Sequence, residues 1–338
     1  MGSSAPILIM SSERSGSNLL RTLLSNHTDL AGPMAAQFLN LFPDRLDVFE
    51  PLDEEEGAIA LVEAMLAVAN HQTFRWGLAI DAAQLVRDHG VRDFLGAFDA
   101  LYRAWQAMDG ARRYVCKENR LFDHAPALME RFPGTQVLYL VRDPRDYVLS
   151  WQKAPILNNT PHEAAVAWQR EQQACLQIEA RYPTAVKRLA YEQLVQDPAG
   201  CMTDVLEFLG ESPQAACFEV QGEKNEGQAW SSFWKNLTQP VLSENFHKFR
   251  GAFPARTLEM IETVCLPSMR ALGYRPETSH RWRPGPWFAA RERRLAARND
   301  ARLRREHAST VRVIQERDAM LHGMIQARYK PELGQGRG

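Results

Sequence analysis

The segment from Pro6 to Leu24 constrains the fold of this chain more than any other. Residues 7–10, Ile-Leu-Ile-Met, form a short apolar run typical of a buried strand. Residues 11–17 are mostly small, with one glycine and one cation, and leucines then recur at helical spacing at positions 19, 20, 23 and 24. The segment therefore predicts a strand, a tight loop and a helix. The free N–H groups of the first helical turn make such a loop a site for an anion.

The side chains of this loop add further hydrogen-bond donors. Ser15, Ser17 and Asn18 carry polar groups, and Arg14 offers a full charge with the planar fork that suits a phosphate. The loop does not match the GxxxxGK[ST] motif of nucleotide triphosphatases, because no Lys follows Gly16. We therefore expect a phosphate-bearing ligand other than ATP with Mg²⁺. An ordinary strand-to-helix turn with serine caps is the alternative.

Three more apolar strands end at polar or charged residues. Residues 136–141 are followed by Arg142, with Ser150 two helical turns further on. Residues 113–117 end at Lys117, which Glu118 follows, and residues 186–191 end at Tyr191. Each of these strand ends is a further candidate for the binding site.

Helical patterns alternate with these strands, and this alternation predicts an α/β fold with a central parallel sheet flanked by helices. In such folds ligands bind beyond the carboxyl ends of the strands. Arg14, Lys117, Arg142 and Tyr191 all lie at or just after strand ends. We therefore expect them to converge on one site.

Composition excludes several classes of protein. The chain has 338 residues, enough for one large domain with an appendage, and its net charge of −1 gives no reason to expect nucleic-acid binding. Its five cysteines are scattered without metal-ligand spacing, which favours reduced thiols in the cytoplasm and no metal. The first residues lack a basic and apolar leader, and no apolar run is long enough to span a membrane.

Taken together, the motifs resemble those of sulfotransferases that use 3′-phosphoadenosine-5′-phosphosulfate (PAPS). The resemblance rests on the loop at residues 12–17 and on Arg142 with Ser150. It extends to Lys117-Glu118, to residues 191–194 and to residues 234–237 and 245–250, and it covers roughly residues 5–274. It implies the P-loop-like sulfotransferase fold, in the soluble, bacterial kind of enzyme. The catalytic domain is then expected at residues 1–275.

The resemblance also implies a reaction and roles for individual residues. The expected reaction is in-line transfer of a sulfonate group from PAPS to a hydroxyl or amine of a small-molecule or carbohydrate acceptor. Arg14 and Lys117 would supply the cations, since Lys117 stands where the family has its catalytic Lys. The residues expected to bind the nucleotide are Arg14, Ser15, Gly16, Ser17, Asn18, Arg142, Ser150, Tyr191, Lys248 and Arg250, with Trp230 or Trp234 on the adenine.

The general base is not found where related enzymes carry it. Some relatives have a Glu about twenty residues after the first loop, and others have a His two positions after the Lys, which here is Asn119. Glu118 is the nearest titratable residue and the catalytic candidate, with His71 and His124 as alternatives. By the same resemblance, residues 31–109 are expected to build the acceptor pocket.

The C-terminal part has a different composition. Residues 276–286 are polar and contain prolines, as in a linker, whereas residues 287–330 favour one long helix from Phe288 to Arg328. An imperfect apolar stripe, which includes Leu321 and Ile325, suggests a coiled coil that joins two copies of the chain. The alternative is that the helix folds back over the acceptor pocket of its own domain.

Two other functional classes remain open at this point. A P-loop-like nucleotide-dependent kinase would need Mg²⁺ ligands and a phosphate-binding Lys that the first loop lacks. A non-catalytic nucleotide-binding scaffold protein is suggested by the helical extension and by the missing standard base.

Overall fold

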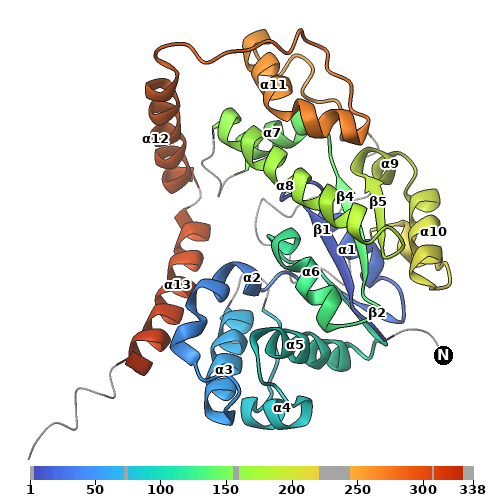
Figure 1. The fold of residues 1–338 in the computed structure, drawn as a ribbon, viewed down its shortest axis with the longest axis vertical. Coiled ribbons are helices and arrows are strands. Elements are labelled where there is room, and N and C mark those ends of the chain that lie inside the picture. The colour runs from blue at the N-terminus through green and yellow to red at the C-terminus, as the bar shows by residue number, and fades with distance from the viewer. Residues whose placement is uncertain (1–3, 72–74, 155–159, 221–243, 307, 330–338) are drawn as a thin grey trace, which may run out of the picture.

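Five parallel strands form the centre of the structure, a computed structural model that describes residues 4–71, 75–154, 160–220, 244–306 and 308–329 (Figure 1). The strands run in the order β2-β3-β1-β4-β5. Their bounds are β1 Ile7–Ser11, β2 Leu30–Ala31, β3 Arg113–Cys116, β4 Gln136–Val141 and β5 Val186–Ala190. Every pairing between neighbouring strands is parallel. This confirms the α/β class and the four expected strands, and it adds the two-residue strand β2.

The helices before β5 are α1 Ser17–Ser25, α2 Phe38–Leu41, the 3-10 helix η1 Pro43–Phe49, α3 Glu55–His71, α4 Ala82–His89, α5 Phe94–Asp109, α6 Leu121–Arg131, α7 Pro144–Lys153 and α8 Pro161–Arg181. Those after β5 are α9 Tyr191–Gln196, α10 Pro198–Leu209, the 3-10 helix η2 Ala215–Phe218, α11 Ala255–Leu272, α12 Phe288–Glu306 and α13 Ala308–Tyr329.

Both faces of the sheet are covered by helices. Along β1, Ile7 and Ile9 belong to one buried apolar cluster with residues of α1, α9 and α10. Leu8 and Met10 belong to the other, with residues of α3, α5, α6, α7, α8 and α11. In Figure 1, α6 and α8 lie in front of the sheet and α1 lies behind it. A strand buried on both faces reads as a continuous apolar run, which is why β1 is visible in the sequence.

Local capping explains where the helices around the site begin. Asp143 caps α7 by accepting a hydrogen bond from the Arg145 backbone, and Pro144 follows at the first helical position. Thr160 and Glu163 form a capping box at the start of α8. Asp197 caps α10, because its side chain accepts a hydrogen bond from Gly200 N.

The C-terminal extension consists of two helices, α12 and α13, with residue 307 between them outside the described part of the chain. In Figure 1 they run along one side of the molecule. Helix α13 packs against α3 and η1, where Leu321 is only 3% exposed and Ile325 contacts the main apolar cluster. The apolar stripe is therefore covered at least in part by its own chain. A coiled coil between two copies, and a dimer built on it, stay predictions.

The segment at residues 276–286, which its composition marks as a linker, is bonded to α11. The buried carboxylate of Glu262 accepts hydrogen bonds from the backbone N–H groups of Glu277 at 2.9 Å and Thr278 at 2.8 Å. The Trp282 N–H donates to Thr263 Oγ1 at 3.2 Å. The division of the chain at this segment stays a prediction.

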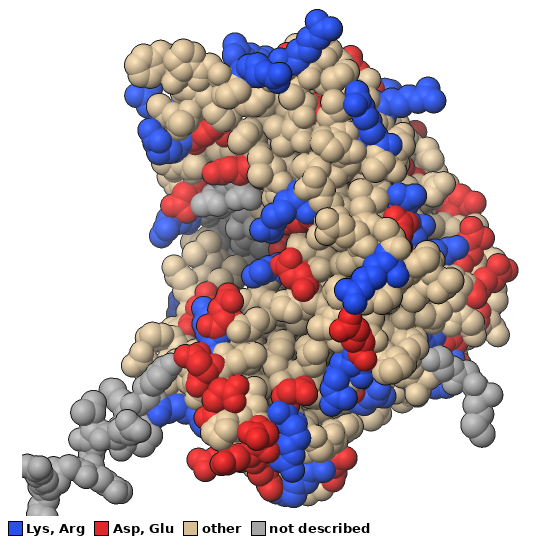
Figure 2. Space-filling model, viewed as in Figure 1, with Lys and Arg blue, Asp and Glu red and all other residues tan. Residues whose placement is uncertain are grey.

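Two surface properties bear on possible partners. Among the described residues, none of the helices is long and apolar enough to cross a bilayer. Figure 2 shows acidic and basic side chains interspersed over much of one face of the molecule. This mixture agrees with the net charge of −1.

Candidate functional site

The loop between β1 and α1 has the backbone of an anion site. Arg14 and Gly16 adopt left-handed conformations, with φ of 65° and 94°. Gly16 precedes α1, and no side chain among the described residues caps its first turn. The Ser15 hydroxyl is buried without a hydrogen-bond partner in the described part of the chain. The backbone N–H groups of the first turn of α1, which starts with Ser17 and Asn18, are thus left for a ligand.

Tyr191 approaches this loop from the end of β5. A Cβ added at Gly16 would collide with carbons of the Tyr191 ring, so only glycine fits there. The phenol oxygen of Tyr191 accepts a hydrogen bond from Asn245 Nδ2 at 2.6 Å. Tyr191 therefore joins the first loop to the segment that begins at residue 244.

The second predicted anion-binding element lies directly against the first. Arg142 Nη1 donates to the backbone carbonyl of Arg14 at 3.0 Å, and its guanidinium lies 4.3 Å from the centre of the Tyr191 ring. Arg14 Nε in turn donates to the Ser150 hydroxyl at 3.3 Å. Of the four strand-end residues expected to converge, the structure thus brings Arg14, Arg142 and Tyr191 together, with Gly16 and Ser150 beside them.

The charges of this cluster favour an anionic ligand. Burial lowers the pKa of Arg14, and the positive charge of Arg142 lowers it further. Arg142 Nε is buried and has no hydrogen-bond partner among the described residues. A bound anion would pair with both guanidinium groups and satisfy such donors. Any ligand with several phosphate or sulfate groups could pair with both guanidinium groups. The geometry therefore indicates that the ligand is an anion.

Lys117 lies on the neighbouring strand end, after β3. Its side chain is buried, and Nζ donates to Asn119 Oδ1 at 2.6 Å. Burial lowers the pKa of Lys117, whereas the charges of Glu13 and Glu118 raise it. The influence of Glu13, the residue before Arg14, places the Lys117 ammonium near the first loop.

Glu118, the next residue, is almost fully buried. Its Oε1 accepts hydrogen bonds from the Tyr102 hydroxyl at 3.1 Å and from Gln37 N at 3.0 Å. Its Oε2 is buried without a partner in the described residues. Burial raises the pKa of Glu118 to about 7, and this suits a group that must accept a proton near neutral pH.

The two histidines considered as bases belong to different surroundings. His71 is the last residue of α3. His124 lies on α6, where burial lowers its pKa and the backbone of Leu39 forms a hydrogen bond with it. Neither histidine shares the hydrogen bonds of Lys117 or Glu118 that the structure describes.

Glu171 is a candidate that the motifs did not reveal. It lies on α8, and burial raises its pKa to about 7, while a hydrogen bond with Ser12 in the first loop opposes the shift. Its Oε2 is also buried without a partner in the described residues. The signal in the sequence was its position: Glu171 falls between the buried Trp168 and Cys175 on one helical face, where a carboxylate is unexpected.

Lys248 and Arg250, expected to bind the nucleotide from a late basic loop, are both exposed. The Arg250 guanidinium pairs with Glu277, from Nη2 at 2.8 Å and Nε at 3.1 Å. The structure therefore does not bring these two side chains into the cluster around Arg14. Trp230 and Trp234 lie outside the described residues.

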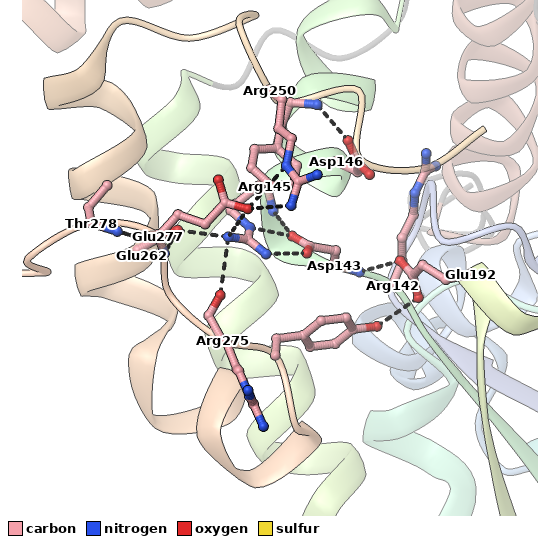
Figure 3. Close-up of polar contacts among 12 residues, drawn as sticks. Arg142, Asp143, Arg145, Asp146, Glu192, Arg250, Glu262, Arg275, Glu277 and Thr278 are labelled. Atoms are coloured by element: carbon pink, nitrogen blue, oxygen red, sulfur yellow. Dashed lines mark hydrogen bonds and ion pairs between the residues drawn. The ribbon is translucent and has the colours of Figure 1, made fainter. Parts of the chain in front are cut away.

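The rest of the Arg-Asp-Pro-Arg-Asp motif is structural. Arg145 is buried and pairs with Asp143 at 2.6 Å and with Glu262 of α11 at 2.8 Å (Figure 3). Asp143 N donates to Glu192 Oε1 at 2.9 Å, and Asp146 Oδ1 accepts from Phe249 N at 2.8 Å. These bonds fix the end of β4, the start of α7 and the segment around residue 249. They thereby support Arg142, which the same motif carries.

A possible metal cluster elsewhere is filled by protein groups. His27, Asp29 and Glu211 are the group with ligand-like spacing among the described residues. Glu211 already pairs with Arg112 and Arg113, and the two ring nitrogens of His27 bond to backbone groups. These contacts leave little reason for a cation to bind there.

Comparison with known proteins agrees with this geometry. The sequence profile of the sulfotransferase family matches residues 6–214, more than half of the chain, so the chain belongs to the sulfotransferase family. Among solved structures it resembles the sulfotransferase domain from the curacin biosynthetic pathway, at 19% identity and a TM-score of 0.54, over 81% of this chain and 99% of that one.

A second similar structure is the sulfotransferase domain from the Synechococcus PCC 7002 olefin synthase, at 19% identity and a TM-score of 0.50 over 78% of this chain and 95% of that one. No curated protein matches the sequence. At this identity the two structures confirm the sulfotransferase fold that the motifs predicted.

Proposed function

We propose that this sulfotransferase uses PAPS and transfers its sulfonate group to a hydroxyl or amine of a small-molecule or carbohydrate acceptor. The observation that carries the proposal is the cluster in which Arg14 contacts Ser150 and Arg142 contacts the Arg14 carbonyl. Two anion-binding elements, 128 positions apart in the chain, thereby form one continuous site. PAPS carries anionic groups at both ends of its ribose and would span such a site.

In this proposal each element binds a different part of the nucleotide. The loop with Arg14, Ser15, Gly16, Ser17 and Asn18 holds the 5′-phosphosulfate on the N-terminus of α1. Arg142 and Ser150 hold the 3′-phosphate, and Tyr191 supports both by packing on Gly16 and under Arg142. Lys248 and Arg250 are proposed to contact the nucleotide as well, and for Arg250 this would require a rearrangement of its pair with Glu277.

The chemistry follows from the charges around the loop. The acceptor oxygen or nitrogen attacks the sulfur, the bond from sulfur to the bridging phosphate oxygen breaks, and that oxygen keeps the electron pair. Arg14 and Lys117 stabilise the negative charge that grows on the leaving phosphate. The products are 3′-phosphoadenosine 5′-phosphate and the sulfonated acceptor.

We propose that a carboxylate removes the proton from the hydroxyl or amine of the acceptor. Glu118 is the first candidate, because its neighbour is Lys117 and its Oε2 makes no hydrogen bond within the described residues. Glu171 is the second, because Ser12 joins it to the other end of the loop.

We also place the reaction in the cytoplasm, as the five cysteines are all free thiols.

Calorimetry with 3′-phosphoadenosine 5′-phosphate, compared with ATP and Mg²⁺, tests the nucleotide. We expect tight binding of the first and weak binding of the second. Mass spectrometry of a metabolite extract incubated with the protein and PAPS then tests transfer, and the mass of one added sulfonate on an acceptor is the expected result. Tight ATP binding would favour a kinase, and nucleotide binding without turnover on any acceptor would favour a scaffold protein.

A further inference from the structure

Helix α13 lies outside residues 6–214, which the family profile matches, and it is connected to the candidate base Glu118 through Gln37. Arg317 on this helix is only 7% exposed, and its Nη1 donates to Gln37 Oε1 at 2.9 Å. The backbone N of the same Gln37 donates to Glu118 Oε1 at 3.0 Å. We propose that Arg317 is a positioning residue, which orients the Glu118 carboxylate for the acceptor by way of Gln37. This inference rests on the proposed function.

Gln37 needs to be held in place. Its φ of 64° lies in the left-handed region, which is strained for a residue with a side chain. It also stands immediately before the short helix α2, and no side-chain cap supports that helix in the described structure. The bond from Arg317 fixes the Gln37 side chain, and the bond to Glu118 fixes its backbone.

Arg317 is itself fixed. Its Nε and Nη2 donate to Asp318 Oδ1 at 2.9 and 2.6 Å, which leaves Nη1 directed at Gln37. Further along the same helix, Leu321 packs into the main apolar cluster and Arg328 Nε donates to the Val48 carbonyl at 3.2 Å. The helix therefore presents one buried cation at a defined position rather than a mobile charge.

The hydrogen bonds of Glu118 determine which of its two carboxylate oxygens can accept a proton. Two donors, Gln37 N and the Tyr102 hydroxyl, both occupy Oε1, so Oε2 is the oxygen left to accept a proton. If Gln37 moves, Oε1 loses one of its donors, and only the hydrogen bonds of Glu118 with Tyr102 and the backbone of Ala36 remain to hold the carboxylate. Arg317 thus acts on the orientation of the base and leaves the nucleotide loop, which it does not contact in the described structure, unchanged.

Kinetics provide the first test. We expect Arg317→Ala to lower kcat about tenfold, the effect of one lost hydrogen bond, with the affinity for 3′-phosphoadenosine 5′-phosphate unchanged within twofold. Arg312→Ala is the matched control, because Arg312 lies on the same helix but is 80% exposed and pairs with Glu316. Gln37→Ala should reproduce the loss, and the double variant Gln37→Ala/Arg317→Ala should be no worse than either single variant.

A second test needs no acceptor. Infrared difference spectroscopy follows the protonation of Glu118, assigned with Glu118→Gln, while the pH is varied. The hydrogen bond from Gln37 stabilises the ionised form, so its loss in Arg317→Ala should raise the pKa of Glu118 above about 7. The titratable groups facing Glu118 are Lys117, Tyr102 and Cys116, and none of them is changed by this substitution.

The outcomes separate this inference from the proposed function. A shifted Glu118 titration without turnover on any acceptor would support the contact and reject the enzyme. An unchanged Glu118 titration in a folded Arg317→Ala protein overturns the inference, whatever the activity. A kcat loss of equal size in Arg312→Ala would also overturn it, because the effect would then belong to the stability of α13.

Discussion

The Tyr191 ring occupies the space that a side chain at position 16 would need, so Gly16 and Tyr191 form one closely packed unit. Gly16 also has a φ of 94°. The anion loop is thus held from the end of β5 by packing, while Arg142 holds it from the end of β4 by a hydrogen bond. Each contact suggests a substitution whose effect can be measured.

Gly16→Ala should remove nucleotide binding and lower stability by at least about 2 kcal/mol, because it combines backbone strain with a collision. Gly110→Ala is the matched control: Gly110 also has a positive φ, 75°, but nothing lies near its added Cβ. The control should cost about 1 kcal/mol and leave nucleotide affinity unchanged. Thermal unfolding and calorimetry on the two variants provide the comparison.

Arg14→Ala should lower turnover roughly a hundredfold, about 3 kcal/mol, because its charge is needed most when the leaving phosphate gains charge. Arg87→Ala, which removes an exposed arginine paired with Glu55, serves as the control and should leave turnover unchanged. Steady-state kinetics with saturating PAPS measure the difference. Full turnover in a folded Arg14→Ala protein would contradict the role assigned to the loop.

Ser150→Ala should weaken binding of nucleotides that carry a 3′-phosphate by about tenfold, the effect of one lost hydrogen bond. Adenosine 5′-phosphosulfate, which lacks that group, should bind with unchanged affinity. Arg142→Ala should show the same preference with a larger loss, and because Arg142 also supports the Arg14 carbonyl, it should slightly weaken both nucleotides. Equal losses for both nucleotides in Ser150→Ala would show that this residue serves only the fold.

Glu118→Gln and Glu171→Gln distinguish the two candidate bases. In the wild-type enzyme kcat should rise with pH near 7. The variant that lacks the true base should lose this rise, and the other variant should keep it. Stability gives a second signal. Since burial raises both folded pKa values from 4.5 to about 7, each carboxyl lowers stability as pH rises through this interval. The difference in free energy of unfolding between either Gln variant and the wild type should therefore shift in favour of the variant by on the order of 3 kcal/mol from pH 4.5 to pH 8.

Arg145→Ala should destabilise the protein by about 3–5 kcal/mol, because it leaves the carboxylates of Asp143 and Glu262 buried and unpaired. Arg181→Ala provides the comparison, since the Arg181–Glu130 pair is about 60% exposed on both sides and should contribute less than about 1 kcal/mol. Denaturant unfolding at neutral pH measures both. A small loss in Arg145→Ala would mean that water or another residue replaces the pairing.

The strand-end residues were predictable because their signal is local. An apolar run followed at once by Arg142 or Lys117 marks a strand and its carboxyl end within a few residues, and parallel strands bring such ends together. The contacts of Gln37 have no such signal: it meets Glu118 across 81 positions and Arg317 across 280.

The separation of Gln37 and Arg317 sets an order of assembly in the cell. Ribosomes add about 5–20 residues per second, so roughly 14 to 56 s pass between the synthesis of one partner and that of the other. Strands β1 and β2 and the anion loop are made before Gln37, and strands β3, β4 and β5 and Arg142 are made within that interval. In the proposed function, the growing polypeptide would therefore complete its nucleotide site first, and only the arrival of α13 would give it an oriented carboxylate with which to act on an acceptor.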